Sequence, residues 1–384
     1  MAKHLRTTSK NATLNDVGAL CGVSYQTVSR VVNESPFVAA KTRAQVLKAI
    51  AELGYRPNLA ARRLATQRSS VIGMVGTSIT YYGPAQVMAS IEETAKRRGY
   101  NFMFAGIERP SKARLVAAID DLCEHQVDGL VLGVRAEGSI DAIHKLCHGV
   151  PFVALDTNAS SNVPNVIVDQ QHGTRLAVEH LLDLGHQQIA FVTGPPLWSA
   201  SKERRKGWAK ALKHVGLELG PCIEGDWSAE SGFAAAVKLL EREPRDFTAI
   251  VAANDHMALG VLRALHAEGI RVPERISVVG YDDLPESRFF EPPLTTVHHD
   301  FAGQGERCVE ILLSMIKHQN LTRRFNFCVR ISSFARVRRR RDDDGGTAAP
   351  LKPSIASCNA AESLRLRPRS IRGLRASAAS PEVR

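Results

Sequence analysis

One short polar stretch, residues 24–33, contains side chains that are well suited to hydrogen bonding with a nucleic acid. Arg30 can donate two hydrogen bonds to the O6 and N7 atoms of guanine, and Gln26 can pair with an adenine edge. Tyr25 can pack on bases or on their methyl groups. If one helix carries these three side chains into the major groove of a duplex, they can read base sequence.

Short hydroxyl and amide side chains lie among these residues. Such groups suit contacts with phosphates, which position a protein on DNA without reading its sequence. The phosphate-contacting candidates are Ser24, Thr27, Ser29 and Asn33. Considered by itself, the stretch is equally compatible with an ordinary surface helix, because Gln and Arg side chains are usually exposed.

A second set of polar residues directly follows apolar segments that we predict to be strands. In doubly wound α/β proteins, ligands bind beyond the carboxyl ends of the strands. The residues at these positions are Asp156, Asn254, Asp255, Asp282 and Asp283. We therefore expect a ligand site among them.

Three short helices must position the first set. Thr13 and Asp16 match a capping box at the start of the first helix. The second helix is predicted over Tyr25 to Val32, with its valines inward and the polar candidates outward, and the third over about Ala40 to Leu53. Two helices joined by a tight turn at Gly22, with a third as support, form a helix-turn-helix unit. Residues 1–57 are thus predicted to be an all-α head.

The body, residues 70–335, alternates short apolar segments with amphipathic ones, which predicts parallel sheets covered by helices. The predicted strands are 71–75, 101–105, 129–134, 151–156, 166–169, 188–193, 249–253, 276–281 and 295–298. The predicted helices are 86–98, 112–125, 170–184, 201–215, 229–242, 256–268 and 301–318. The body exceeds the usual size of one core, so we expect two lobes, about 70–168 with 299–327 and about 169–298.

Two further segments flank the body. Residues 58–69 are Ala-rich, and isolated helices shorter than about 12 residues are marginal, so we expect a hinge that folds only when it is held. Residues 336–384 are rich in Arg, Ser and Ala without periodicity, which indicates a disordered tail. A weak contribution of this tail to DNA affinity stays open beside the simpler reading of a solvated segment.

Basic residues are concentrated at the two ends of the chain. Residues 1–69 contain eleven Lys and Arg residues against three Asp and Glu residues, and residues 336–384 contain twelve against five. The net charge of the whole chain is +11, so the body between the ends is mildly acidic. A compact basic head on an acidic body indicates a polyanionic partner.

Other classes of protein find little support. No stretch approaches the roughly 18 apolar residues of a membrane span, and the N-terminus lacks the apolar segment of a secretory signal, so we expect a cytoplasmic protein. The seven cysteines are scattered without a Cys-x-x-Cys pair, which favours reduced thiols over disulfides or zinc.

Motifs for cofactors and catalysis are not found either. There is no Gly-x-Gly-x-x-Gly, phosphate-loop or His-Glu-x-x-His motif, so no catalytic residue, metal or cofactor is predicted. His298 and His299 are adjacent on a predicted strand and point to opposite faces, which makes them a poor metal pair.

Several motifs, in order along the chain, resemble the LacI/GalR family of repressors. The head motif is residues 22–33, continued at 40–43, 51–55 and 57–58. The body motifs are residues 173–176, 178–181, 184–190, 225–228, 253–255, 257–260, 276–283 and 292–296. The similarity covers about residues 13–320 and implies a homodimeric repressor with a two-lobed, periplasmic-binding-protein-like (type I) effector domain.

The resemblance also implies roles for individual residues. It assigns DNA contacts to Thr13 and Asn58, and it matches Leu64 to a residue that wedges into the minor groove, with Ala61 on the same face of a hinge helix. For Leu64, a helix staple or a dimer contact stays open. The effector-binding residues that it implies are Thr77, Pro84, Asp156, Arg204, Trp227, Asn254, Asp282, His299 and Phe301.

The chemistry of this implied set suits a sugar. Carboxylates and amides can bind paired hydroxyls, Arg204 can donate two hydrogen bonds, and Trp227 can stack on an apolar sugar face. Three alternatives stay open: Trp227 as plain core, Asp282 as a helix N-cap, and Arg204 in a solvated charged run.

The sequence departs from the family pattern at five positions. Asn15 puts one DNA contact in doubt, and Gly133, Trp198, Ala200 and His299 reshape the effector pocket, so the effector need not be a galactoside. No C-terminal leucine-heptad helix is visible, and we expect a dimer.

The resulting hypothesis is a repressor of a carbohydrate-utilisation operon that a sugar inducer releases from its operator. Its expected partners are double-stranded operator DNA, a sugar-like effector and a second copy of the chain. The alternatives are a co-repressor-dependent regulator of the same family, a solute-binding protein that does not bind DNA, and, least supported, an enzyme.

Overall fold

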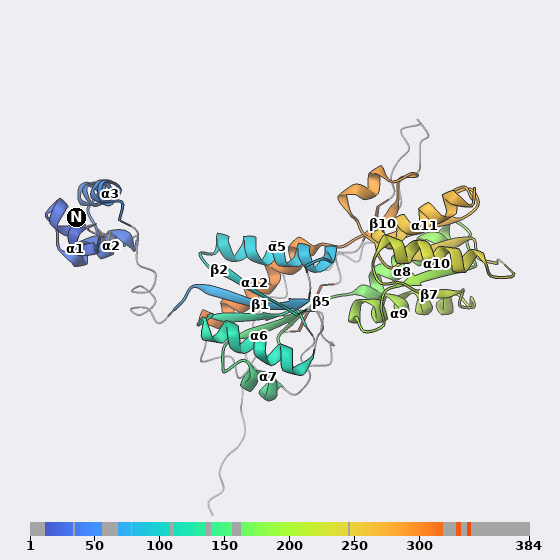
Figure 1. Cartoon of the computed structure of the whole chain (residues 1–384), viewed down its shortest axis with the longest axis horizontal. Helices are drawn as coiled ribbons and strands as arrows, with labels where there is room; N and C mark the ends of the chain where they lie inside the picture. Colours follow the sequence, from blue (N-terminus) through green and yellow to red (C-terminus); the bar gives the residue numbers. More distant parts are fainter. Residues whose placement is uncertain are drawn as a thin grey trace, which may run out of the picture. The chain divides into compact units, whose positions relative to one another are not determined.

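The computed structural model describes residues 12–33, 35–55, 68–77, 79–107, 111–134, 140–155, 163–244, 246–317, 328–331 and 336–338. These residues form a helical head and two α/β lobes (Figure 1). The predicted hinge residues Asn58, Ala61 and Leu64 and the implied effector residue Asp156 lie outside the described residues.

The head consists of α1 (Leu14–Cys21), α2 (Tyr25–Val32) and α3 (Ala40–Leu53). Thr13 and Asp16 form the predicted capping box: the Thr13 hydroxyl accepts from the Asp16 amide at 3.3 Å, and the Asp16 carboxylate accepts from the Thr13 amide at 2.8 Å. α1 ends at Gly22, whose φ of +67° suits a residue without a Cβ. The inner faces of the helices meet in a small core of Val17, Val28, Val31, Val46, Ala49 and Tyr55.

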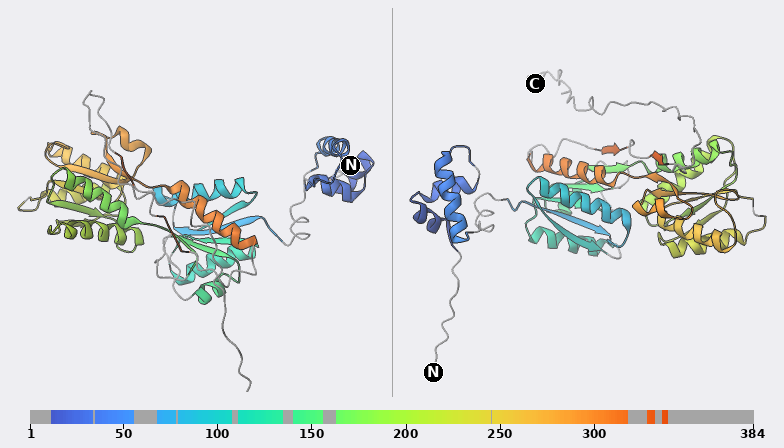
Figure 2. Two further views of the ribbon diagram at one scale, coloured as in Figure 1. Left: turned by 180° about the vertical axis from the view of Figure 1, so that it is seen from behind. Right: turned by 90° about the horizontal axis from the view of Figure 1, so that it is seen from above.

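Lobe 1 is built on a six-stranded sheet in which every pair of neighbours is parallel. In spatial order its strands are β11 (Cys328–Ile331), β5 (Asn165–Val168), β4 (Phe152–Leu155), β3 (Gly129–Leu132), β1 (Val71–Thr77) and β2 (Asn101–Ile107). Its helices are α5 (Tyr82–Arg97), α6 (Lys112–Glu124), α7 (Ile140–Leu146) and α12 (Phe301–Lys317). α5 and α12, far apart in the sequence, lie side by side on one face of the sheet, with α6 and α7 on the other (Figure 2).

Lobe 2 repeats this layered design. In spatial order its strands are β12 (Arg336–Arg338), β10 (Thr295–His298), β9 (Ser277–Asp282), β8 (Ala249–Ala252), β6 (Ile189–Thr193) and β7 (Cys222–Glu224). Its helices are α8 (Gln170–Asp183), α9 (Ser199–His214), α10 (Ala229–Leu240) and α11 (Asp255–Ala267), followed by the short 3-10 helix η1 (Pro285–Phe289). Neighbouring strands are parallel except β10 and β12, which are antiparallel.

The expected architecture is found, and the structure corrects its C-terminal boundary. β11 extends the sheet of lobe 1 beyond residue 327, and β12 pairs with β10 inside the stretch read as a disordered tail. That reading is wrong for Arg336–Arg338, because a three-residue strand can add to a sheet edge without the periodicity on which sequence analysis depends. β7 and α7 were not predicted either, for the same reason of length.

The described residues lack two kinds of feature. Among the helices that the structure describes, none combines the length and the apolar character that a membrane crossing requires. No group of three or more His, Cys, Asp or Glu side chains in the described ranges is arranged to hold a metal ion.

Candidate functional sites

The outer face of α2 carries the predicted base-reading side chains. Tyr25 is 52% exposed, and Gln26 and Arg30 are also exposed, while Val28 and Val31 on the opposite face are buried in the head core. The two buried valines fix the rotation of the helix, so the three polar side chains point away from the protein. The structure therefore brings Tyr25, Gln26 and Arg30 onto one accessible surface.

Several of the predicted phosphate-contacting side chains already stabilise the helices of the head. The Ser24 hydroxyl caps α2 by accepting from the Thr27 amide at 3.3 Å, and the two hydroxyls lie 3.0 Å apart. At the other end, the Asn33 amide group donates to the Ser29 hydroxyl at 3.4 Å. These side chains, like Thr13, combine a local structural role with exposure at the same face or end of a helix.

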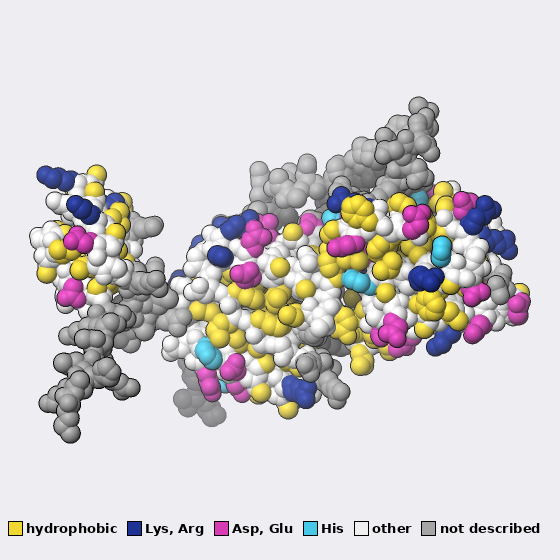
Figure 3. Space-filling view, turned by 45° about the horizontal axis from the view of Figure 1, so that its top comes forward, with side chains coloured by type: hydrophobic (Ala, Val, Ile, Leu, Met, Phe, Trp, Pro, Cys, Tyr) yellow, Lys and Arg dark blue, Asp and Glu magenta, His cyan; other side chains and the backbone are white. Residues whose placement is uncertain are grey.

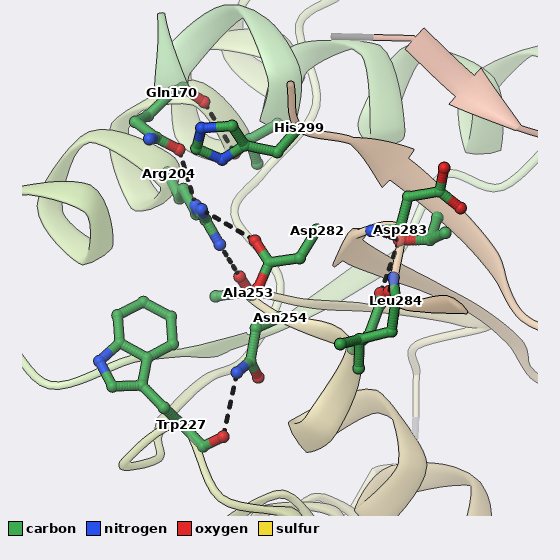
Figure 4. Close-up of polar contacts among 12 residues, drawn as sticks. Gln170, Arg204, Trp227, Ala253, Asn254, Asp282, Asp283, Leu284 and His299 are labelled. Carbon is green, nitrogen blue, oxygen red and sulfur yellow. Dashed lines mark hydrogen bonds and ion pairs between the residues drawn. The ribbon is translucent and has the colours of Figure 1, made fainter. Parts of the chain in front are cut away.

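In lobe 2, Arg204 is the centre of a buried polar cluster (Figure 4). Its side chain is only 6% exposed. It donates from Nε to Gln170 at 2.9 Å, from Nη2 to Asp282 at 3.2 Å, and from Nη1 to the Ala253 carbonyl. The guanidinium also lies 3.6 Å from the centroid of the Tyr281 ring, which favours a cation there. The alternative of a solvated run is wrong for Arg204, although Lys202, Arg205 and Lys206 beside it are exposed.

The turn that carries Asp282 has an unusual backbone. Asp282 and Asp283 adopt φ values of +111° and +57°, which cost free energy in residues with a Cβ. The wholly buried Asp255 carboxylate holds this turn by accepting from the Leu284 amide at 2.8 Å and the Thr296 hydroxyl at 2.5 Å. A Cβ at Gly280 would lie 2.1 Å from Asp255 Oδ1, so the absence of a side chain there admits the carboxylate.

Asn254, and not Asp282, is the helix cap. The Asn254 side chain accepts from the Met257 amide at 2.9 Å at the start of α11, and it donates to the Trp227 carbonyl at 3.0 Å. The alternative of Asp282 as an N-cap is wrong, since its carboxylate pairs with Arg204. The described contacts of Asn254 position Trp227, and they differ from the direct hydroxyl contact that the resemblance implies.

Two buried ring nitrogens of residues beside this cluster have no hydrogen-bond partner among the described residues: Trp227 Nε1 and His299 Nδ1. The two rings lie on either side of Arg204 (Figure 4). Burial, reinforced by the charge of Arg204, lowers the pKa of His299 to about 3, so its imidazole is neutral. Buried polar groups are rarely left unpaired, which makes these two atoms candidate ligand contacts.

The two charges at the centre of the cluster balance, because Arg204 is paired with Asp282. Beside them, the His298 ring lies 2.9 Å from the Asp283 carboxylate. Burial raises the pKa of Asp282 to about 6, so this carboxyl is ionised above that pH. Burial raises the pKa of Asp255 to about 8, so its carboxyl is mostly protonated at neutral pH. The buried Arg204–Asp282 pair thus offers hydrogen-bonding groups without a net charge of its own.

Aromatic side chains from lobe 1 complete the surroundings. Phe301, at the start of α12, stacks on His299 with ring centroids 3.9 Å apart, and Tyr82 contacts Phe301 at 5.7 Å. Burial, followed by nearby carboxylates of which Asp282 is the strongest, raises the pKa of Tyr82 to about 12. Thr77 ends β1, and Pro84 lies in the first turn of α5.

Sequence analysis missed Tyr81, Tyr82, Gln170 and Tyr281. For Gln170 and Tyr281 the available signal was their position, because Gln170 directly follows a predicted strand and Tyr281 ends one. Tyr81 and Tyr82 lie six and seven residues beyond the predicted strand 71–75, where no such signal exists. His299 occupies one of the positions that depart from the family pattern, and it is buried with its Nε2 atom 3.3 Å from Gln304.

The surface of the lobes contrasts with that of the head. On the face seen in Figure 3, basic and acidic side chains of the lobes lie interspersed, without an extended patch of one sign. The exposed basic residues of the described head include Arg30, Lys41 and Lys48. We therefore expect the head, and not this face of the lobes, to attract a polyanion.

Comparison with known proteins identifies both parts. Residues 13–58 match the family described as "Bacterial regulatory proteins, lacI family", and residues 178–332 match the periplasmic binding protein-like domain. The chain is 40% identical over 311 residues to the lactose operon repressor of Escherichia coli (strain K12), covering 81% of this chain and 86% of that protein. It is 34% identical over 314 residues to the HTH-type transcriptional repressor PurR of Pasteurella multocida (strain Pm70), covering 80% and 93%.

Comparison with solved structures supports the same family. The lac repressor dimer bound to operator and the anti-inducer ONPF matches with a TM-score of 0.73 at 41% identity, covering 81% of this chain and 94% of that chain. A helix-turn-helix head, two layered lobes and relatives that are repressors rather than enzymes lead to one conclusion. The chain belongs to the LacI family of bacterial regulatory proteins and is a DNA-binding transcriptional repressor.

Proposed function

We propose that this repressor controls an operon for carbohydrate use and leaves its operator when a neutral sugar binds beside Arg204. The observation that carries the proposal is the charge-balanced, buried polar cluster with two unpartnered atoms, Trp227 Nε1 and His299 Nδ1. On this proposal the protein works in the cytoplasm, with its operator.

In the head, α2 is the element proposed to enter the major groove. Arg30 then grips guanine, Gln26 pairs with an adenine edge, and Tyr25 packs on bases or methyl groups. Contacts of Thr13, Ser24, Thr27, Ser29 and Asn33 with phosphates set the register. The proposed minor-groove wedge of Leu64 with Ala61, and the contact of Asn58, belong to the hinge outside the described residues.

In lobe 2, the charge balance favours a neutral ligand. A charged ligand would lose its hydration without meeting an unpaired opposite charge, because Arg204 and Asp282 already neutralise each other. A sugar hydroxyl can both donate and accept, so it can satisfy the indole N–H of Trp227 and the free nitrogen of His299. The indole face next to them suits the apolar face of a sugar ring.

The remaining implied residues take supporting roles in this proposal. Thr77, Pro84 and Phe301 form the lobe 1 side in this proposal. Asp156, which lies outside the described residues, is proposed to add a carboxylate. Asn254 acts indirectly by holding the backbone of Trp227. Asp282 accepts from a ligand hydroxyl with the lone pairs that Arg204 leaves unused.

Release from DNA requires two states of a dimer. Two heads fit a pseudo-palindromic operator, and an effector that binds one lobe arrangement more tightly shifts the equilibrium away from the DNA-binding one. Exposed apolar side chains on lobe 2, Phe233, Leu259 and Phe289, support a second copy as the partner. Phe233 and Leu259 lie on α10 and α11, two helices packed directly against each other.

A gel-shift titration tests the proposal. The full chain is titrated at physiological salt against a lac-type palindromic operator and a scrambled duplex, each with a panel of sugars starting with galactosides. We expect a salt-sensitive preference for the operator that at least one sugar weakens. Equal binding of both duplexes would contradict sequence-specific recognition.

The same titration separates the alternatives. A sugar that strengthens operator binding would indicate a co-repressor, the opposite sign of the same coupling. The relatives named PurR make a purine-related ligand the second candidate, so purine bases belong in the panel. A response to these bases and to no sugar would overturn the sugar proposal and leave the repressor intact.

A further inference from the structure

A groove that is open to solvent lies on the outer face of α9 in lobe 2, and we call it the α9 groove. Its lining residues come from α9 and from the segment before β7: Lys202, Arg205, Lys206, Trp208, Ala209 and Leu219. Arg204, on the same helix, pairs with Asp282 in the buried cluster and does not line the groove. The α9 groove is thus separate from the candidate effector site.

The core of the lobe fixes the floor of the α9 groove. The Trp208 side chain is only 2% exposed, donates from its indole nitrogen to the Ile189 carbonyl at 3.2 Å, and stacks on Phe191 with ring centroids 5.4 Å apart. Ala209 is half-buried, and Leu219 remains 43% exposed. An apolar side chain of a partner can therefore pack against Leu219 while Trp208 stays in place.

Positive charge surrounds this floor. Among the described residues, no ion pair joins Lys202 or Arg205 to a carboxylate, whereas Lys206 lies 2.6 Å from Glu203. Glu218, next to Leu219 in the sequence, is exposed. Along α9 as a whole, the half-buried Glu203 faces five exposed cations: Lys202, Arg205, Lys206, Lys210 and Lys213. The outer face of α9 is therefore a basic surface on a mildly acidic body.

The ends of the chain do not complement this charge. Residues 1–69 and residues 336–384 each contain more than twice as many Lys and Arg residues as Asp and Glu residues. The acidic run Asp342–Asp344 directly follows four arginines, Arg338–Arg341. β12, which ends at Arg338, also lies on the opposite edge of the lobe 2 sheet from β7, which follows the α9 groove. The charge thus points to a partner outside this chain.

The apolar floor and the cationic rim together favour an acidic peptide over a nucleic acid. Phosphates need only the cations and gain nothing from an apolar floor. A peptide in which Asp or Glu residues flank an apolar side chain uses both features. Its apolar side chain packs against Leu219, and its carboxylates pair with Lys202 and Arg205.

We propose that the α9 groove is a docking site for an acidic peptide segment of another protein, held by one apolar anchor side chain. This inference goes beyond the proposed function, since neither the operator nor the effector takes part in it. Lys202 and Arg205 recognise the charge of the segment, and Leu219 contacts the anchor.

Fluorescence polarisation of the full chain at physiological salt tests the proposal with three labelled synthetic peptides. The first is a run of Glu with one central Leu, the second has Ser in place of that Leu, and the third is a run of Lys with a central Leu. We expect the first peptide to bind at least about tenfold more tightly than the second, because burial of one leucine side chain contributes this factor or more. The third peptide should bind most weakly.

Charge reversal identifies the cations involved. Lys202→Glu and Arg205→Glu should each weaken binding of the acidic Leu peptide by at least about tenfold, because a like charge then faces the peptide. Lys238→Glu, at an exposed position on α10 of the same lobe, is the matched control and should retain the affinity. Lys48→Glu is the control for the basic head, which attracts acidic peptides with or without Leu, and it should retain the preference for Leu over Ser.

A second pair of variants tests the apolar contact. Leu219→Ser should reduce the preference for the Leu peptide over the Ser peptide to less than about threefold, because the anchor then meets a polar wall. Leu184→Ser is the control, since Leu184 is 54% exposed at the end of α8 and does not line the α9 groove. This variant should keep the full preference.

Three results would overturn the proposal, with circular dichroism used to check that each variant is folded. The first is equal binding of the two acidic peptides by the unmodified chain. The second is a loss of affinity for a scrambled duplex, and not for the acidic peptide, in the charge-reversal variants, which would make the face a nucleic-acid contact. The third is a loss of self-association of these variants in sedimentation, which would assign the face to a second copy of the chain.

Discussion

The two candidate sites are built in opposite ways. In the head, Tyr25, Gln26 and Arg30 project from a helix whose other face makes the core, and none of the three is buried. In lobe 2, Arg204, Asp282 and His299 are themselves buried and are held by one another and by the surrounding backbone.

This difference indicates which of the two sites can be altered without disturbing the fold. An exposed side chain that meets a partner adds little to the free energy of folding, so its loss changes binding alone. A buried polar side chain satisfies other buried groups, so its loss leaves them unpaired as well. In the head, the side chains proposed to contact DNA are separate from those that stabilise the fold. In lobe 2, the same buried side chains stabilise the fold and form the proposed effector site.

The largest effect is expected from a substitution that breaks the buried cluster. Arg204→Ala should lower the free energy of unfolding by about 3–5 kcal/mol, because it leaves the Asp282 carboxylate buried without its partner. Urea denaturation followed by circular dichroism measures this change. Arg205→Ala, one residue along α9 and exposed, is the matched control and should stay within about 0.5 kcal/mol. Similar values for the two variants would mean that the cluster does not stabilise the lobe.

The second largest effect is expected at the exposed site in the head. Arg30→Ala should reduce discrimination between a lac-type operator and a scrambled duplex by about 1–3 kcal/mol, with the free energy of unfolding unchanged. Competition gel shifts give the discrimination. Lys48→Ala, exposed on α3, serves as the control and should retain it. A large loss of stability in the Arg30 variant would show that the two sites are not built differently after all.

The third effect concerns protons in the lobe, and it is the smallest when it is compared over one pH unit. Burial raises the pKa of Asp255 to about 8 in the folded protein, against a usual value near 4, so between these pH values the folded chain binds the extra proton. The stabilisation is complete below about pH 4 and declines by about 1.4 kcal/mol per pH unit until about pH 8. Asp255→Asn should flatten this decline.

Urea midpoints at pH 5, 6, 7 and 8 measure that slope. Asp246→Asn, at an exposed position of the same lobe, is the control and should retain the slope of the unmodified chain. An equally steep decline in the Asp255 variant would assign the pH dependence to other groups, with the raised pKa of Asp282 as the first to examine.

Local patterns account for most of what could be predicted. The capping box of Thr13 and Asp16 needs only four consecutive residues, and the inward face of α2 follows from the spacing of its valines. A strand of three residues, such as β7 or β12, and a helix of only seven, such as α7, are too short for their periods to be recognised. Arg204 could not be told from the exposed cations beside it until α9 was packed on the lobe.

The sequence by itself determined the family, the three-helix head, the alternation that builds two α/β lobes and the outward face of α2, because these depend on motifs and on contacts close along the chain. Only the tertiary structure decided that Asn254 rather than Asp282 caps a helix, that Arg204 is buried against Asp282, 78 positions away, and that Tyr81 of lobe 1 meets Trp198 of lobe 2. The physical reason is that burial and pairing are set by elements distant in sequence, and no local pattern records which of them will meet.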